Sequence, residues 1–375
     1  MKIGFIGLGK LGLPSAQLFV EKGHQLDGYD VNELINPEVN IVNTIEEAVL
    51  HKDIVFIAVP TPHQDGYDGS RPTHNLEAKD FMYKTLTKVV EQADSFMNDK
   101  QLLVVISTVL PGTIRQHIQP KVKNARLIYN PYLIAMTTVK QDLLDPEMII
   151  VGTVDGNNTG YDDIVKLQEF YNTICNEGYR FVKGTWEEAE CIKIFYNTFL
   201  STKISLVNMI QDVAQKINYS DTDIITQALA DSTNRITSSK YMKAGLGDGG
   251  PCHPRDNIAL RYLAEKLGLG YNLFDAINFS RDMQARNLAK AILEQGRRIQ
   301  FSSNYYKPGT QITDGSYSLL VQYYINVLGG VVVDSKPEVF VIIHEGDPVP
   351  DDVKVFDPWR TYRGKNTCVY YGKTR

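Results

Sequence analysis

The sequence is poor in cysteine, and its four cysteines lie far apart. They are Cys175, Cys191, Cys252 and Cys368, and no pair has the CxxC spacing that zinc sites and redox motifs use. In a chain of 375 residues this pattern favours neither a metal site nor a disulfide framework. It fits a protein of the reducing cytoplasm.

An excess of basic charge and a long apolar run are also missing. The formal net charge is -5, so the chain lacks the basic surface that would neutralise a nucleic-acid backbone. No apolar run reaches the roughly 18 residues needed to cross a bilayer. Residues 1–6 resemble a strand and lack the basic start and apolar core of a signal peptide. We therefore expect no nucleic-acid partner, no membrane association and a cytoplasmic location.

The composition is that of a folded protein with several domains. Hydrophobic residues make up 43% of the chain and charged residues 22%, a balance typical of folded proteins and not of disordered ones. A chain of 375 residues is longer than one ordinary domain. We expect two or three domains, each with its own core.

A glycine motif near the start indicates a dinucleotide site. Residues 7–12 read GLGKLG, between a predicted strand at 2–6 and a predicted helix at 14–22. In this order the glycines allow a tight turn and close approach of a pyrophosphate to the helix N-terminus. Taken alone, the motif could equally be a turn that binds nothing.

The next predicted strand strengthens that interpretation. It covers residues 25–29 and ends in Asp30, about twenty residues after the glycines, where a carboxylate can accept both ribose hydroxyls. A negative side chain there would repel a 2′-phosphate, so we expect NAD rather than NADP.

The alternation of strand and helix continues, which predicts a parallel sheet. Strands are predicted at residues 53–60 and 101–109, and a helix at 76–96 lies between them. Both strands end in segments containing Pro and Thr, at the edge where ligands bind in open sheets. As isolated motifs these strand ends could be ordinary turns.

Two features in the middle of the chain suggest catalysis. A long helix is predicted at residues 185–216, and Lys193 and Asn197 share one of its faces because they are four residues apart. Further on, a glycine-rich loop at residues 245–251 leads to Cys252 at a predicted helix start, with Asp256 four residues later. A helix N-terminus lowers the pKa of a thiol. The alternatives are a solvated Lys–Asn pair and a buried, unreactive cysteine.

Together these motifs resemble the UDP-glucose/GDP-mannose dehydrogenase family, in the family's order and over nearly the whole chain. The matching segments are 7–14, 59–62, 107–109, 130–131, Lys193 with Asn197, and 247–252. The resemblance implies an α/β fold: an NAD-binding Rossmann domain (1–183), a central helical domain that dimerises through its long helix (184–295), and a shortened Rossmann-like domain (296–375). The last would contain a helix at 316–326 and strands at 330–334, 339–343 and 353–356.

The resemblance also implies the chemistry: NAD-dependent oxidation of the primary alcohol of a nucleotide sugar, with UDP-glucose as the default substrate. Cys252 would attack the aldehyde formed first, so that a second oxidation yields a thioester. Lys193 would stabilise the oxyanion or help remove the alcohol proton. Asn197 and Thr108 would position the reacting oxygen and a water, and Asp256 would orient Lys193 or that water.

Two sets of binding residues are implied as well. The cofactor set is Gly7, Gly9, Lys10, Leu11, Gly12, Asp30, Pro60, Thr61 and Thr108. The substrate set is Tyr132, Leu133, Lys193, Asn197, Arg235, Tyr241, Gly249 and Lys307. Arg235 matches a family arginine that reaches the substrate of the neighbouring subunit. Lys307 matches a lysine at the start of the domain that closes over the substrate.

One departure from the family pattern concerns the last chemical step. Family members carry two Glu residues where this chain has Tyr132 and Met136. The first is thought to help water hydrolyse the thioester, and a tyrosine cannot act as a base near neutral pH without a large fall in its pKa. Three hypotheses follow: complete oxidation to the uronic acid, a reaction that stalls at the aldehyde or thioester, and a non-catalytic protein that binds sugar nucleotides.

Overall fold

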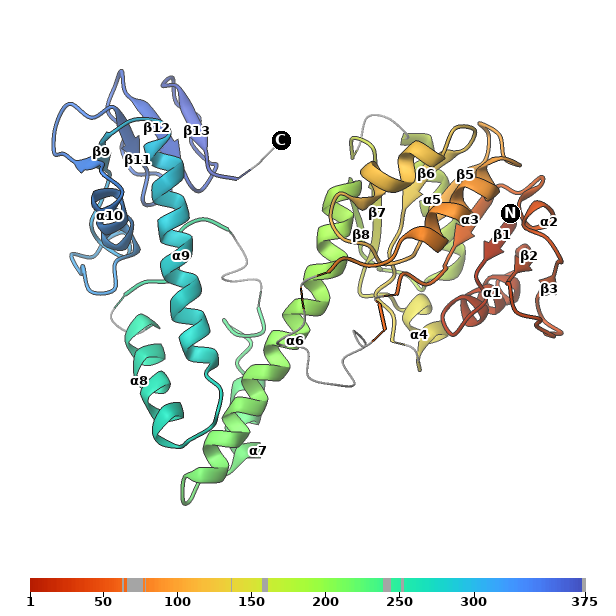
Figure 1. Cartoon of the computed structure of the whole chain (residues 1–375), viewed down its shortest axis with the longest axis horizontal. Helices are drawn as coiled ribbons and strands as arrows, with labels where there is room; N and C mark the ends of the chain where they lie inside the picture. The colour runs from red at the N-terminus through yellow and green to blue at the C-terminus, as the bar shows by residue number, and fades with distance from the viewer. Residues whose placement is uncertain are drawn as a thin grey trace. The chain divides into compact units, whose positions relative to one another are not determined.

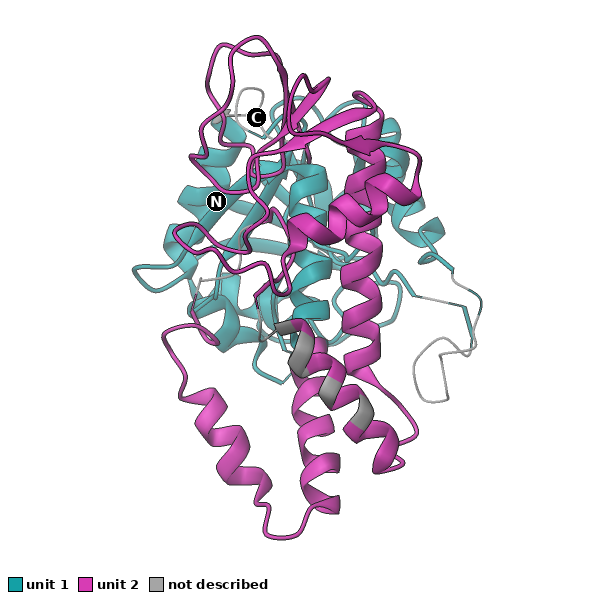
Figure 2. Ribbon diagram, turned by 90° about the vertical axis from the view of Figure 1, so that its left-hand side faces the viewer, with its two compact units in different colours: residues 1–201 teal, residues 202–375 magenta. Residues whose placement is uncertain are grey.

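The computed structural model consists of two compact units, Met1–Ser201 and Thr202–Arg375 (Figure 2). It describes residues 1–62, 64–65, 77, 79–135, 137–156, 161–238, 244–250 and 253–372, except the side chains of residues 161, 253, 255, 256, 259 and 262. Within this part of the chain, none of the helices has the length and apolar character needed to span a membrane.

The first unit is built on an eight-stranded sheet (Figure 1). Its order is β3-β2-β1-β4-β5-β6-β7-β8, and every neighbouring pair is parallel except β6 with β7. The first six strands thus have the order of a dinucleotide-binding fold. Their bounds are β1 Lys2–Ile6, β2 Gln25–Tyr29, β3 Asn40–Ile41, β4 Ile54–Ile57, β5 Leu102–Val105, β6 Arg126–Tyr129, β7 Ile149–Thr153 and β8 Phe181–Thr185.

Helices cover both faces of this sheet, which explains why its central strands are apolar throughout. In β4, Ile54 and Phe56 face one core, and Val55 and Ile57 face the other. The first core includes α1 (Gly12–Glu21), α4 (Val139–Leu144) and α5 (Tyr161–Ile174). The second includes α2 (Ile45–Val49), α3 (Lys84–Asp94), the short helix η1 (Ile114–Ile118) and the start of α6 (Trp186–Lys216). The short helix η2 (Gln119–Lys121) follows η1.

The helix predicted at residues 76–96 begins later than expected, at Lys84. Before it, the backbone N–H of Met82 donates to the carbonyl of Pro62 at 2.8 Å, and the Asp80 carboxylate accepts from the N–H of Phe81. These local bonds replace helical ones, so the described residues just before Lys84 run beside the end of β4 instead.

Among the described residues, four helices lie between the two sheets in the sequence. The long helix α6, predicted at residues 185–216, covers Trp186–Lys216 and crosses the boundary between the units. It is followed by α7 (Thr222–Ala230), α8 (His253–Lys266) and α9 (Leu273–Leu293). Since α8 begins at His253, the predicted helix start next to Cys252 is confirmed.

The second unit contains a five-stranded parallel sheet of order β10-β9-β11-β12-β13, which is a doubly wound order. Helices α9 and α10 (Tyr317–Val327) pack against it, as Figure 1 shows. The strands are β9 Arg298–Phe301, β10 Val331–Val332, β11 Val339–Val341, β12 Lys354–Asp357 and β13 Cys368–Tyr370. The predicted fold class is confirmed, while the division into three domains stays a prediction.

Candidate active site

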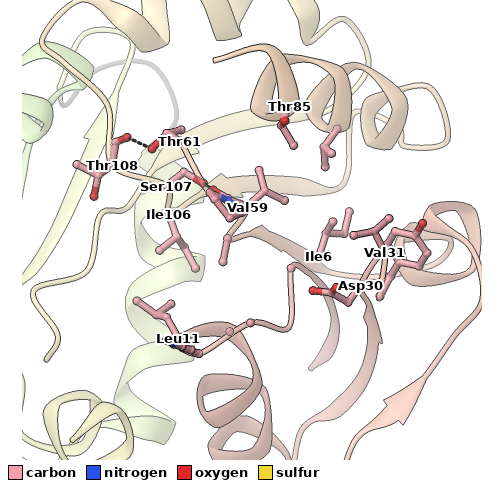
Figure 3. Close-up of a pocket in the computed structure, with 18 of the residues that line it drawn as sticks. Ile6, Leu11, Asp30, Val31, Val59, Thr61, Thr85, Ile106, Ser107 and Thr108 are labelled. Atoms are coloured by element: carbon pink, nitrogen blue, oxygen red, sulfur yellow. Dashed lines mark hydrogen bonds between the residues drawn. The ribbon is translucent and has the colours of Figure 1, made fainter. Parts of the chain in front are cut away.

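A cavity of about 870 Å³ opens at the carboxyl edge of the first sheet, where β1, β2, β4 and β5 end. Figure 3 shows Asp30 and Val31 at one end, Thr61 and Thr108 at the other, and Leu11 of the glycine turn along one side. The structure brings together here every residue of the predicted cofactor set: Gly7, Gly9, Lys10, Leu11, Gly12, Asp30, Pro60, Thr61 and Thr108.

The glycine turn leaves one wall of the cavity without side chains. Gly7 has a φ of 99°, and a Cβ at Gly12 would lie only 1.8 Å from the carbonyl oxygen of Gly7. Both positions therefore require glycine for the turn itself. Gly9 is exposed, and a Cβ there would meet nothing within 4 Å. This open backbone lies just before α1, as the binding of a pyrophosphate requires.

Asp30 is fixed beside this turn by three hydrogen bonds. One carboxylate oxygen accepts from the N–H of Leu8 at 2.8 Å. The other accepts from the backbone and side-chain amides of Asn32, at 2.9 and 3.0 Å. A carboxylate offers about four lone pairs, so acceptor capacity remains for ribose hydroxyls.

The opposite end of the cavity is formed by the ends of β4 and β5. The Thr61 hydroxyl donates to the carbonyl of Thr108 at 2.6 Å, and the Ser107 hydroxyl donates to the carbonyl of Val59 at 2.6 Å. These bonds tie the two strand ends together and leave the side chain of Thr108 at the cavity.

Lys193 of α6 reaches the same cavity. Its ammonium donates to the carbonyl of Tyr132 at 2.6 Å, and it is largely enclosed by protein. Burial lowers the pKa of Lys193 below that of a free lysine. A lysine with a lowered pKa can exchange a proton more readily near neutral pH, as acid–base catalysis needs.

The side chain of Tyr132 lies in the core, with 5% of its surface exposed. The hydroxyls of Tyr132 and Tyr171 are 3.2 Å apart, and Tyr171 donates to the side-chain oxygen of Asn130. Burial raises the pKa of Tyr132 above its ordinary value, so this phenol is not a base near neutral pH. Its carbonyl, rather than its hydroxyl, is the group that contacts Lys193.

We expect Tyr132→Phe to lower the free energy of unfolding of the first unit by about 0.5–1.5 kcal/mol, because it removes a buried hydrogen bond. Urea unfolding followed by fluorescence would measure it. A Trp359→Phe background leaves Trp186, which is buried in that unit, as the reporting tryptophan. The control is Tyr179→Phe, which removes a partly exposed hydrogen bond to Asn172 and should cost less. Equal costs in the two variants would contradict the buried role of Tyr132.

Glu190 of α6, which the sequence motifs did not indicate, binds the segment that follows β5. Its carboxylate is fully buried and accepts from the N–H groups of Gly112 and Ile114, at 2.5 and 2.7 Å. It therefore binds the N-terminus of η1 to α6, one turn before Lys193. The sequence feature that could have indicated Glu190 is its position three residues before Lys193 on the same predicted helix.

Glu190→Gln should lower the free energy of unfolding by about 2–3 kcal/mol. It replaces a charged acceptor by a neutral one, and the side-chain amide NH2 of the glutamine would face the backbone N–H of Gly112 or Ile114. The same Trp186 fluorescence measurement applies. Glu169→Gln changes an exposed Glu of α5 and serves as the matched control, with an expected effect near zero. A Glu190→Gln variant as stable as this control would show that the buried carboxylate is not an anchor.

Two models of a single family match the chain. The NAD-binding domain of the UDP-glucose/GDP-mannose dehydrogenase family matches residues 34–175, and the central domain of that family matches residues 187–281. Together they cover more than half of the sequence. The chain belongs to the UDP-glucose/GDP-mannose dehydrogenase family.

Named relatives agree with this membership. UDP-glucose 6-dehydrogenase AglM of Haloferax volcanii is 27% identical over 90% of this chain and 83% of its own length. UDP-glucose 6-dehydrogenase TuaD of Bacillus subtilis is 25% identical over 90% of this chain and 76% of its own. In fold, the chain is similar to a GDP-mannose dehydrogenase from Pseudomonas aeruginosa, with a TM-score of 0.82 at 19% identity over 99% of both chains.

The other residues that the family resemblance implies are distributed over both units. Asn197 is exposed on α6, one turn after Lys193, and does not line the cavity. Leu133 lines a small pocket beside the cavity. In the second unit, Arg235 is exposed after α7, Lys307 is exposed after β9, and Gly249 lies in the loop before α8. Cys252, Tyr241 and Met136 lie outside the described residues, as does the side chain of Asp256.

The three described cysteines of this family member are poor nucleophiles. Burial raises the pKa of Cys175 to about 12 and that of Cys368 to about 11. The pKa of Cys191 is also raised, by burial and by the carboxylates of Glu190 and Glu187. Thiols with raised pKa values carry little thiolate near neutral pH, so none of these three is suited to act as a nucleophile.

The cavity also has lining residues that the motifs did not indicate. Asn32 lies two residues after Asp30, and helix α3 contributes a row of polar side chains: Lys84, Thr85, Lys88 and Gln92. Their spacing of three and four residues along a helix was the available signal. This spacing could not show that these α3 side chains line the cavity.

Proposed function

We propose that this protein oxidises the sugar primary alcohol of a nucleotide sugar to the uronic acid, with NAD+ as the hydride acceptor. The observation that carries the proposal is that one cavity of the first unit holds both kinds of group. It has a glycine turn and Asp30 at one end, and Thr108 with the Lys193 ammonium among its other lining residues. A dinucleotide site is thus continuous with a group that can act on a proton or an oxyanion.

The residues present fit NAD. The open backbone at Gly9 before α1 suits the pyrophosphate, and the fixed carboxylate of Asp30 suits the ribose hydroxyls. That carboxylate also disfavours the extra phosphate of NADP. When bound, NAD+ supplies the oxidising power for both stages of the reaction.

The protein's own groups would act as follows. Lys193 takes up the alcohol proton or stabilises the oxyanion, with Thr108 positioning the reacting oxygen. The Cys252 thiolate then adds to the aldehyde carbon, and the resulting thiohemiacetal becomes a thioester on the second oxidation. Water, oriented through Asp256, cleaves the thioester and restores the thiol. Overall, one alcohol, two NAD+ and one water give one acid, two NADH and two protons.

UDP-glucose is the first substrate to test, because the two relatives described above are named UDP-glucose 6-dehydrogenases. The decisive assay measures NADH formation with a panel of UDP-, GDP- and dTDP-sugars and quantifies the acid product. We expect one nucleotide sugar to give NADH and acid. If the purified protein forms no NADH with any member of the panel, the proposed function is wrong.

The protein would act in the cytoplasm as a homodimer through α6. Between Phe195 and Ile204, α6 carries large apolar side chains that are exposed in the single chain. They are Phe195 (63%), Phe199 (51%), Leu200 (41%) and Ile204 (61%). Exposed apolar patches of this kind are typical of interfaces. Contact with a second copy would bury them, and the family resemblance implies the same arrangement.

Ile204→Asp should therefore convert the dimer to single chains, because it places a charge in an apolar interface. Sedimentation velocity would show the mass falling from two chains to one. The control is Ile35→Asp, since Ile35 is fully exposed in a loop of the first unit and should leave the mass unchanged. A wild-type protein that sediments as one chain would contradict the dimer.

A further inference from the structure

The glycine-rich loop before Cys252 packs on the core of the second unit. Leu246 contacts the core formed by the second sheet, α9 and α10. A Cβ at Gly247 would lie 2.3 Å from the ring of Tyr317, the first residue of α10. The loop thus approaches α10 so closely that not even a methyl group fits between them.

Arg281 of α9 binds this loop to the start of α10. Its Nε donates to the Asp248 carboxylate at 2.7 Å, and its Nη2 donates to the carbonyls of Asp248 and Gly315, at 3.3 and 3.2 Å. The guanidinium also lies 5.4 Å from the centre of the Tyr317 ring. Only 13% of the Arg281 side chain is exposed, so this charged contact is shielded from solvent.

The two loops that Arg281 joins also touch directly. Gly315 has a φ of 64°, and a Cβ there would lie 2.2 Å from the carbonyl oxygen of Gly250. Gly250 is two residues before Cys252. The segment between β9 and α10, which carries Lys307, therefore contacts the backbone that leads to the nucleophile.

We propose that Arg281 is a positioning residue, which acts through Asp248 and Gly315 to fix the backbone that presents Cys252. The proposal rests on the role of Cys252 in the proposed function. A glycine-rich segment has few side chains to hold it in place and loses much conformational entropy when ordered. Arg281 supplies this order with one side chain, from a helix that belongs to the same unit. A nucleophile displaced by about 1 Å can cost roughly a hundredfold in rate.

The test uses the full chain with Arg281→Met, which keeps the apolar stem and removes the charge. Alkylation by iodoacetamide is followed at the Cys252 peptide by mass spectrometry across a pH series, and kcat and KM are measured separately. We expect the alkylation profile to shift and kcat to fall by about a hundredfold, while KM for NAD+ changes by less than about twofold. Arg281→Lys keeps the charge and should recover part of the rate.

Two further variants keep the result interpretable. Arg286→Met removes an exposed arginine of the same helix and should behave as wild type. Asp248→Asn preserves the shape of the side chain and is the substitute test if Arg281→Met does not fold. It should shift the alkylation profile in the direction that loss of the Arg281 contact predicts. The proposal would be overturned if folded Arg281→Met or folded Asp248→Asn showed the alkylation profile of the wild type and a kcat within about twofold of the wild-type value. Since alkylation needs no substrate, it tests Arg281 even if no nucleotide sugar is oxidised.

Discussion

Replacing Cys252 by serine should reduce formation of the acid by at least about a thousandfold, the scale expected when a covalent nucleophile is removed. A serine hydroxyl at the start of α8 is not ionised near neutral pH, so the aldehyde is not captured and no thioester forms. The first oxidation does not need the thiol. We therefore expect Cys252→Ser to form at most one NADH per site, without acid, in a rapid-mixing experiment.

The other cysteines provide the control for this prediction. Cys368→Ser changes a thiol whose pKa is raised to about 11 by burial, and it should leave acid formation unchanged. Peptide mass spectrometry after reaction with substrate and NAD+ should find the sugar only on the Cys252 peptide. Acid production by Cys252→Ser at the wild-type rate would show that no covalent step at this residue is needed.

Replacing Lys193 by methionine should lower kcat by about a hundredfold to ten-thousandfold, because the variant removes the ammonium and keeps the buried stem. The KM for NAD+ should change little, since the glycine turn and Asp30 are untouched. Lys203→Met is the matched control, because Lys203 is an exposed lysine further along the same helix. A Lys193→Met enzyme with the kcat of this control would exclude Lys193 from the chemistry.

The pH dependence of the first oxidation tests what Lys193 does. Burial lowers its pKa, so the neutral amine forms at lower pH than in a free lysine, whose value is 10.5. If the amine accepts the alcohol proton, the rate rises as pH rises through this lowered pKa and then levels off. We expect this ascending limb in the Cys252→Ser background, where no thiol contributes, and its loss when Lys193→Met is added. A rate that falls over the same range would assign Lys193 to oxyanion stabilisation instead.

The parts of the site that sequence predicts are those that local rules determine. The GLGKLG turn, the strand ending in Asp30 and the end of β5 at Thr108 each follow from a short pattern, and the parallel sheet then brings their ends to one edge. Helical spacing places Lys193 and Asn197 on one face, and the family resemblance implied the role of Lys193. The glycine turn and the strand ends needed only residues close together in the chain, together with a fold in which strand ends converge.

The parts that sequence missed depend on contacts between distant residues. Nothing near Tyr132 shows that its phenol turns to Tyr171, which leaves a carbonyl at the cavity. Arg281 and Asp248 are 33 residues apart, and their pairing follows from the packing of α9 against the glycine loop. Packing of this kind is set by the complete core, so no short motif contains it.

The most direct test of the account counts three quantities in one reaction: NADH, uronic acid and sugar mass on the Cys252 peptide. After mixing with a nucleotide sugar and NAD+, we predict two NADH for each acid, and a transient sugar adduct on Cys252 that appears before the acid and decays with it. Two NADH and one acid without any adduct on Cys252 at any time would contradict covalent catalysis by this residue.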